Sequence, residues 1–345
     1  MMPIDYSVQP FSAEIVAAYR RLFPESATEK SDAQLSWRFE RGPHGPGLFA
    51  VARAGGDRQI VGMIALVATR LRIGSTLQSA YQAIDTVVDP AFRGRGVFIG
   101  LGQAAQDGSN HDGRIIWGFP NANAASGWFG RLGWQNFGTV PFMVRPLRSG
   151  YFLRKLLPFL GSIDVPLARQ RKATATQIIK RFGDDADDLW NASRATDGIA
   201  VERNADWLNW RLLDRPNVPY RSVGSYDPKG GLEAFVSTCS LNKHGGNICY
   251  VMEAMSPLEK LASLAVLLRD EVARAARRGA EVALAWCPQS APNRAAYRRA
   301  GFLPLPNLVR PVEIHFGARA LVPQVDAAIE DGSKWFISYL DSDTV

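Results

Sequence analysis

The sequence predicts a mixed α/β protein built from two copies of one unit, and three observations lead to this prediction. The chain has 345 residues, more than a single small hydrophobic core usually organises. An apolar run typical of a strand is followed by a turn rich in glycine and arginine, and then by the start of a helix. Several short patterns of the first half also recur, in the same order, in the second half.

The strand, turn and helix occupy residues 83–105. Residues 83–88 have the pattern of a strand that carries one carboxylate, Asp85. The turn contains two arginines and two glycines: Arg93, Gly94, Arg95 and Gly96. Glycines let backbone N–H groups approach an anion, a helix N-terminus favours negative charge, and guanidiniums add charge-assisted hydrogen bonds. The segment is therefore a candidate phosphate-binding loop, and a surface turn with two solvated arginines is the alternative.

A second pair of elements follows. A strand is expected at residues 114–119, and then a short helix that begins near Asn121 and Asn123 and ends in the turn Leu132-Gly133-Trp134. Together the two segments resemble the acetyl-coenzyme A loop and a later motif of the GNAT acyltransferases. Residues 93–97 fit the family's loop pattern, Arg/Gln-x-x-Gly-x-Gly/Ala, whereas Phe98 departs from the small residue at its last position. The resemblance covers most of residues 1–148 and does not identify a substrate.

The resemblance implies a mixed-sheet GNAT fold that binds acetyl-coenzyme A, or another acyl-coenzyme A, as co-substrate. In the family, the backbone beside the splayed strand holds the pantetheine arm and the loop holds the pyrophosphate. The residues expected at the cofactor are Val87, Val88, Arg93, Gly94, Arg95, Gly96, Val97, Phe98, Asn121, Asn123 and Phe129. Asp85, on the same strand, is the candidate group to accept the proton of an attacking amine. A hydrogen-bonded structural carboxylate is the alternative for Asp85.

The general acid of the family is not evident in this chain. Many members have a tyrosine four residues before the glycine of the Leu-Gly-aromatic turn, where this sequence has Phe129. A phenyl ring has no proton to give. Because a thiol of pKa about 8.5 is a tolerable leaving group near neutral pH, either no acid is needed or water serves.

The internal repeat aligns residues 119–134 with residues 287–302 without a gap. The same offset places Asp85 on Glu253. After Glu253, however, the second copy has no glycine or arginine turn. Instead it starts an amphipathic helix at Pro257, which Gly279 can end. We expect a degenerate second copy that shapes the substrate cleft or stabilises the first, and one cofactor in the N-terminal copy.

The expected division follows from the repeat. It comprises an acyl-coenzyme A-binding GNAT domain at 1–148, a linker at 149–180, a degenerate GNAT-like domain at 181–318 and a C-terminal extension at 319–345. The linker is apolar and basic, so it is either a patch for a membrane surface or anionic substrate, or a helix that packs on both domains. Pro158 and Gly161 favour the second reading, because they interrupt a long helix.

A substrate cleft is expected at the domain junction. Leu35-Ser36-Trp37-Arg38 is echoed by Leu208-Asn209-Trp210-Arg211. Aromatic faces and guanidiniums suit sugars, aromatic amines or carboxylates, which makes Trp37, Arg38, Trp210 and Arg211 candidate substrate residues. The alternative is that the tryptophans belong to the core.

Composition limits the class of protein. Apolar residues make up 46% and charged residues 21% of the chain, which should fold without metals or disulfides. Three cysteines and the lack of a signal-peptide pattern favour the cytoplasm, and no apolar run is long enough to span a bilayer. The four histidines have no ligand spacing, so no metal site is expected. The net charge of +7 comes without an aromatic and basic motif typical of nucleic-acid binders.

Three functional hypotheses remain. The first is an N-acyltransferase that acylates a primary amine of a small molecule, such as an amino sugar or amino acid derivative. The second is a non-catalytic protein that binds or senses acyl-coenzyme A, which Phe129 and the degenerate half favour. The third is a FemAB-like transferase of cell-envelope assembly. The intact loop at Arg93–Val97 argues against this last hypothesis, because such enzymes take their acyl group from a charged RNA. The sequence does not indicate the oligomeric state.

Overall fold

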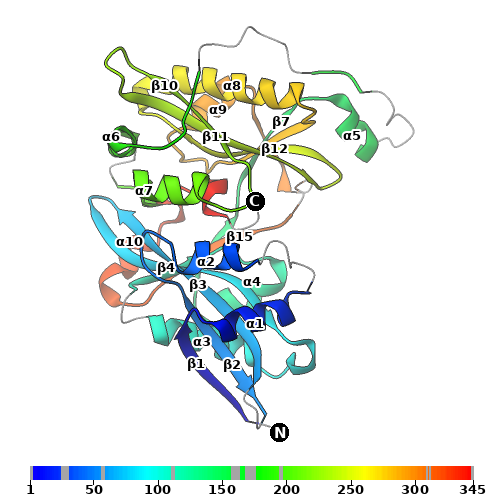
Figure 1. Cartoon of the computed structure of the whole chain (residues 1–345), viewed down its shortest axis with the longest axis vertical. Helices are drawn as coiled ribbons and strands as arrows, with labels where there is room; N and C mark the ends of the chain where they lie inside the picture. The colour runs from blue at the N-terminus through cyan, green and yellow to red at the C-terminus, as the bar shows by residue number, and fades with distance from the viewer. Residues whose placement is uncertain are drawn as a thin grey trace.

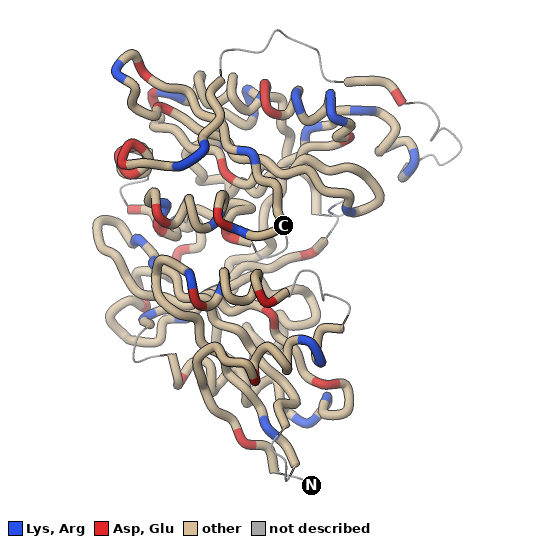
Figure 2. Tube along the Cα trace, viewed as in Figure 1, with Lys and Arg blue, Asp and Glu red and all other residues tan. Residues whose placement is uncertain are grey.

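The computed structural model shows two lobes stacked along the long axis of the molecule (Figure 1). It describes residues 3–24, 31–55, 59–109, 113–156, 164–167, 176–193, 197–307, 310 and 312–342. Within these ranges, no helix is long and apolar enough to cross a membrane. Basic and acidic residues are interspersed along the trace of both lobes (Figure 2). The expectation of a mixed α/β fold with two related units is confirmed.

The first sheet has eight strands and lies in the lower lobe of Figure 1. Its path runs β1 (Ile4–Pro10), β2 (Leu48–Ala54), β3 (Gln59–Ile73), β4 (Thr76–Val88), β5 (Ile115–Gly118), β15 (His315–Ala320) and β6 (Gln135–Thr139), and β9 (Ile199–Val201) pairs with the far end of β3. Only the β4–β5 pair is parallel. A parallel pair needs a crossover, here α3 (Val97–Ser109), which packs on β1, β2 and β3. The remaining helices of this half are α1 (Ala13–Leu22), α2 (Asp32–Phe39) and α4 (Ala122–Gly130).

The second sheet repeats this order strand for strand. Its seven strands run β8 (Gln177–Ile178), β10 (Arg221–Tyr226), β11 (Leu232–Lys243), β12 (Gly246–Met255), β13 (Val282–Trp286), β7 (Phe142–Pro146) and β14 (Leu303–Pro304). Again one pair, β12–β13, is parallel. Its crossover is α8 (Leu261–Arg277), the amphipathic helix expected from the sequence, which buries Leu264, Leu268 and Val272. The turns at Gly133 and Gly301 both have positive φ, 69° and 85°, at the equivalent places that the repeat predicts.

Strands cross between the two units in both directions, and besides β9 these are β7 and β15. β7 belongs in sequence to the first half but pairs with β13 and β14 of the second sheet. β15 comes from the second half but lies between β5 and β6 of the first sheet. We therefore keep the division into 1–148 and 181–318 as a proposal, with β7 assigned to the second unit and β15 to the first. The expected linker contains α5 (Ser149–Leu156) and β8, and Pro158 and Gly161 lie outside the described residues.

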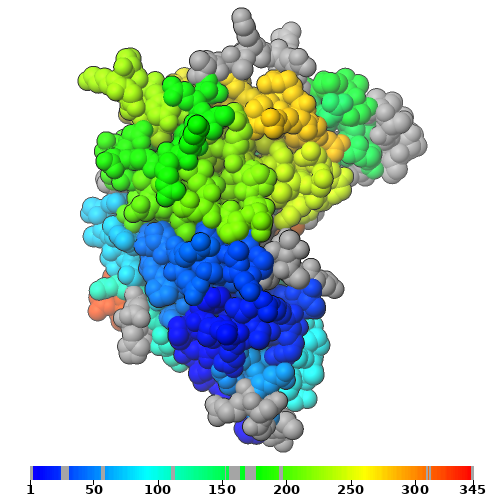
Figure 3. Space-filling view, in the orientation of Figure 1, coloured from blue at the N-terminus to red at the C-terminus, as the bar shows by residue number. Residues whose placement is uncertain are grey.

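Trp37 and Trp210, the echoed tryptophans, meet at the junction of the two units. Their rings stack with centroids 4.8 Å apart and planes 19° apart. Each indole N–H donates to the other residue's carbonyl oxygen, both at 2.9 Å. Trp37 comes from α2, and Trp210 comes from a π-helical turn (Asn209–Leu213) that follows α7 (Ala205–Leu208). Figure 3 shows the same junction from outside, where residues of the second half rest directly on those of the first.

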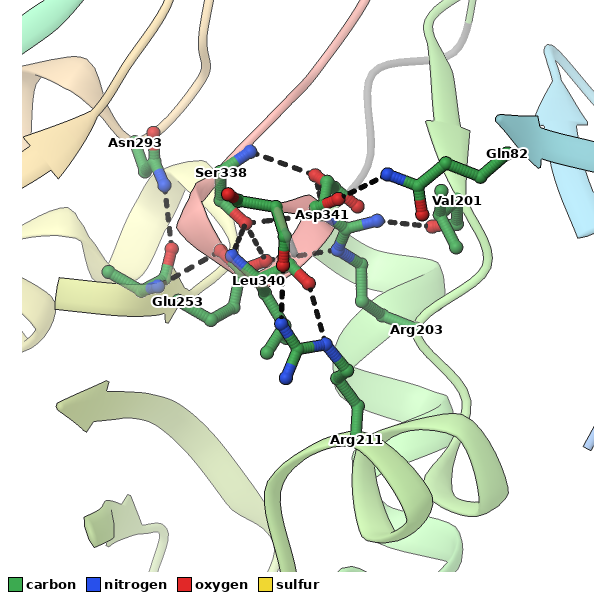
Figure 4. Close-up of polar contacts among 11 residues, drawn as sticks. Gln82, Val201, Arg203, Arg211, Glu253, Asn293, Ser338, Leu340 and Asp341 are labelled. Carbon is green, nitrogen blue, oxygen red and sulfur yellow. Dashed lines mark hydrogen bonds and ion pairs between the residues drawn. The ribbon is translucent and has the colours of Figure 1, made fainter. Parts of the chain in front are cut away.

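A buried ionic network lies at the junction, where it includes Ser338 and Asp341 of the C-terminal segment (residues 332–342; Figure 4). The Arg203 guanidinium donates to Glu253 at 3.0 Å and to Asp341 at 2.6 Å, and all three side chains are at most 1% exposed. The Ser338 hydroxyl donates to Glu253 at 2.9 Å. Gln82 of β4 donates to the carbonyl oxygen of Asp341 at 2.7 Å, which ties the segment to the first sheet. One guanidinium thus faces two carboxylates away from water.

We predict a pH dependence of stability from this network. Burial, with a contribution from Asp341, raises the pKa of Glu253 even though Arg203 opposes the shift. Because the folded pKa exceeds the unfolded value of about 4.3, this group's contribution is greatest at low pH and falls as pH rises through the folded pKa. Glu253→Gln should remove this decline. Urea unfolding of both proteins between about pH 4.5 and 8 measures it.

The matched control is Glu259→Gln, which alters an exposed glutamate of the same unit. Its pH profile should follow the wild type. If Glu253→Gln also follows the wild-type profile, the Glu253 carboxyl does not titrate in this way.

Candidate functional site

A bulge in β4 lines a large cleft. In the register with β3, Val87 pairs with Met63 and Ile84 pairs with Ala65, so Asp85 and Thr86 both lie opposite Ile64. Asp85 has φ 47°, a left-handed conformation that aspartate tolerates better than most residues. β4 and β5 stay paired as far as Ala83 and Gly118. Beyond that pair the two segments no longer pair, and residues of both line the opening between them.

The loop after β4 forms another part of the lining. Asp89 caps a short 3-10 turn (Pro90–Phe92) by accepting from the Ala91 N–H at 2.9 Å. Gly94 and Gly96 have φ values of 74° and 79°, and a Cβ on either would meet no atom within 4 Å. The loop is thus glycine-dependent for its backbone and open to the cleft, and α3 starts directly after it. Arg93 donates through Nε to the Val88 carbonyl at 3.1 Å, which anchors the loop to β4.

The cleft has a volume of about 1320 Å³. Most of the residues expected at a cofactor line it together with Asp85: Val87, Val88, Arg93, Gly94, Gly96, Val97, Phe98, Asn121 and Asn123. Sequence reasoning missed several others: Gln82, Thr86, Phe92, Phe119, Ser126, Arg131, Trp134, Val312 and Ile314. Arg131, just after α4, adds a second guanidinium to the lining. Its position as a basic residue at a helix end could have indicated it from the sequence. Val312 and Ile314 precede β15, so no local pattern in the first half could indicate them.

Two of the expected residues lie elsewhere. Arg95 is exposed, and its guanidinium lies 5.3 Å from the centre of the Phe92 ring, outside the cleft lining. Phe129 packs toward the exchanged strand β15, with its ring centre 6.0 Å from that of His315. The α4 helix therefore presents Asn123, Ala124 and Ser126 to the cleft, and not Phe129.

Asp85 is held by side chains from α1 and α2. Tyr19 donates its hydroxyl to Asp85 Oδ2 at 3.2 Å, and Arg38 approaches the same oxygen at 3.5 Å. The Asp85 side chain is 9% exposed, yet the residue still lines the cleft. The carboxylate is thus oriented by two partners and lies directly before the Val87 and Val88 backbone.

The four expected substrate residues do come together. Trp37, Arg38, Trp210 and Arg211 line one cavity of about 30 Å³ at the unit junction. This cavity shares Gln82 and Ile84 with the cleft. Trp37 and Trp210 are core residues, 2% and 9% exposed, as the alternative for them expected, and their role in substrate binding stays a prediction.

The opening at the equivalent place in the second unit is smaller than the cleft of the first. β12 carries a bulge at the corresponding place, because Glu253 pairs with Ser237 while Val251 pairs with Thr238. Here, however, the backbone is already satisfied: Ala254 N–H donates to the Glu253 side chain at 3.0 Å, and its carbonyl accepts from Asn293 at 2.6 Å. The equivalent segments line a pocket of about 280 Å³ that includes Trp335 of the C-terminal segment. After β12 the chain passes through a 3-10 turn (Leu258–Lys260) directly into α8.

No protein-family model matches the sequence, and no curated protein is significantly similar to it. Solved structures are similar over nearly the whole chain. N-myristoyltransferase from Saccharomyces cerevisiae, solved with bound myristoyl-CoA and inhibitors, is 12% identical with a TM-score of 0.59, covering 96% of this chain and 86% of its own.

Two further structures match about equally well. A probable N-acyltransferase from Enterococcus faecalis is 12% identical with a TM-score of 0.60, covering 92% of this chain and 72% of its own. A GCN5-related N-acetyltransferase from Anabaena variabilis is 11% identical with a TM-score of 0.61, covering 93% and 73%. The chain therefore has the tandem GNAT acyltransferase fold.

Proposed function

We propose that the protein is an N-acyltransferase that takes an acetyl or other acyl group from acyl-coenzyme A and transfers it to a primary amine of a small molecule. The proposal rests on one observation, that two features line the same cleft. These are the β4 bulge at Asp85 and the glycine loop with Arg93 at the start of α3. The solved yeast neighbour, which holds myristoyl-CoA, supports an acyl-coenzyme A in a fold of this kind.

Each part of the cleft suits one part of such a donor. The backbone N–H groups of the loop at Gly94 and Gly96 and the α3 N-terminus suit a pyrophosphate, and Arg93 adds a charge-assisted bond. The Val87 and Val88 backbone, beyond the bulge, suits the pantetheine arm and can polarise a thioester carbonyl. Arg131 is a further cation at the rim.

We expect the acceptor to enter the cleft beside Asp85. In the reaction a bond forms between the amine nitrogen and the acyl carbon, the carbon–sulfur bond breaks, and coenzyme A leaves as its thiolate. Asp85 is proposed to accept the amine proton through water. An amino sugar or amino acid derivative remains the proposed class of acceptor, because Trp37, Arg38, Trp210 and Arg211 adjoin the cleft. The three cysteines are free and buried, which supports the proposed cytoplasmic location.

One observation favours a second candidate function, binding or sensing of acyl-coenzyme A without catalysis. The described residues that line the cleft include no Tyr, His, Cys or Lys. Release of free thiol from acetyl-coenzyme A over a panel of amines separates the two candidates, since a sensor binds the donor but releases none.

We predict that Arg93→Ala weakens coenzyme A binding by roughly tenfold or more, because it removes a charge-assisted phosphate bond worth about 1.5–3 kcal/mol. Gly96→Val should also weaken binding. It places a β-branched residue at a positive φ beside the phosphate. Isothermal titration calorimetry measures both. Arg95→Ala is the matched control, expected to cost less because its guanidinium lies outside the cleft lining. If both test variants keep the wild-type affinity and the wild-type circular dichroism spectrum, the loop at residues 93–97 does not bind coenzyme A as proposed.

The same titration yields the stoichiometry. We expect one coenzyme A per chain, bound by the first unit, because the second unit's bulge is closed by Glu253 and Asn293. A measured value of two per chain would contradict this expectation.

Asp85→Asn should lower the turnover number by about a hundredfold or more and leave coenzyme A affinity nearly intact, if Asp85 receives the amine proton. The measurements are the coenzyme A dissociation constant and the pH–rate profile with an amine found by the thiol-release panel. A purely structural carboxylate predicts instead that stability and binding are lost together. An acidic limb that survives the substitution unchanged would show that another group takes the proton.

A further inference from the structure

We propose that the transferred acyl group is short, because an aromatic wall centred on Phe119 closes the inner end of the opening between β4 and β5. This inference rests on the proposed acyl transfer and concerns the donor's chain length. The yeast neighbour was solved with a myristoyl donor. The wall indicates a different donor class for this chain.

Phe119 stands where an acyl chain would have to pass. It follows the last residue of β5, Gly118, at the point where β4 and β5 cease to pair. It is half-buried and lines the cleft, as do Ala83 and Ile84 on the β4 side. A thioester carbonyl placed at Val87 and Val88 would direct its acyl group into the opening between β4 and β5.

The Phe119 ring is held by neighbours on three strands. It packs against Trp286 of β13 at 4.9 Å between centroids, against Phe316 of β15 at 5.2 Å, and edge-on against Trp117 of β5 at 5.7 Å. Trp286 in turn stacks on Tyr339 of the C-terminal segment at 4.7 Å. Displacing the ring would disturb packed aromatic contacts from both units, so the wall is a fixed part of the core.

Little space lies behind the opening. The cavity that shares Gln82 and Ile84 with the cleft measures about 30 Å³. A cavity of that size holds one or two water molecules. Within the part of the chain that the structure describes, an acetyl or propionyl group fits in front of the wall, whereas an eight-carbon chain has no continuing tunnel.

Calorimetric binding of coenzyme A and of acetyl-, butyryl- and octanoyl-coenzyme A tests the proposal without a known acceptor. For the wild type, we expect acetyl-coenzyme A to bind about as tightly as coenzyme A and octanoyl-coenzyme A about tenfold or more weaker. Phe119→Ala should bring octanoyl-coenzyme A to within about threefold of the acetyl donor. Phe119→Leu, a milder change, should give a partial gain and serves if Phe119→Ala does not fold.

Phe137→Ala is the matched control. Phe137 belongs to the same aromatic cluster, 5.2 Å from Phe316, but does not line the cleft. It should leave the preference for short chains unchanged. Wild-type binding of octanoyl-coenzyme A as tight as that of acetyl-coenzyme A would overturn the short-chain inference alone. The absence of binding by coenzyme A itself would overturn the proposed function, and the inference with it.

Discussion

The exchange of β7 and β15 is the constraint on which the rest of the structure depends. Each sheet has the same strand order, and in each the sixth position is filled by a strand from the other unit. Backbone hydrogen bonds on both sides of β15 hold it between β5 and β6. Val312 and Ile314 consequently reach the cleft, and Phe316 reaches the aromatic wall. The second unit thus shapes the cleft of the first through main-chain pairing, and not merely by contact between surfaces.

The two units show how one backbone position acquires two different environments. Asp85 and Glu253 occupy equivalent places at a strand bulge, but Asp85 lies beside an open cleft with Tyr19 and Arg38. Glu253 is sealed in with Arg203 and Asp341. The repeated tryptophans behave in the opposite way, because Trp37 and Trp210 exchange identical hydrogen bonds across the junction. Similarity is therefore kept where the units touch and lost at the cleft of the first unit.

The sequence was most informative where chemistry forces a local pattern. The positive φ values at Gly94 and Gly96 favour glycine, so the sequence alone predicted the loop. The spacing of apolar residues likewise predicted the α8 helix. The sequence did not predict the strand exchange. β7 and β15 are short strands, and their residues do not indicate which sheet each one joins. The same exchange turns Phe129 toward β15 and away from the cleft, an orientation that depends on a strand almost two hundred residues later.

The exchanged strand has a consequence for how the protein comes to be made. A ribosome makes most residues of the cleft long before β15, and a domain complete in itself could fold as it emerges. Here the first sheet lacks β15 until residues 315–320 have been synthesised. The first lobe must therefore remain incomplete, with an unpaired strand edge, until β15 has been synthesised.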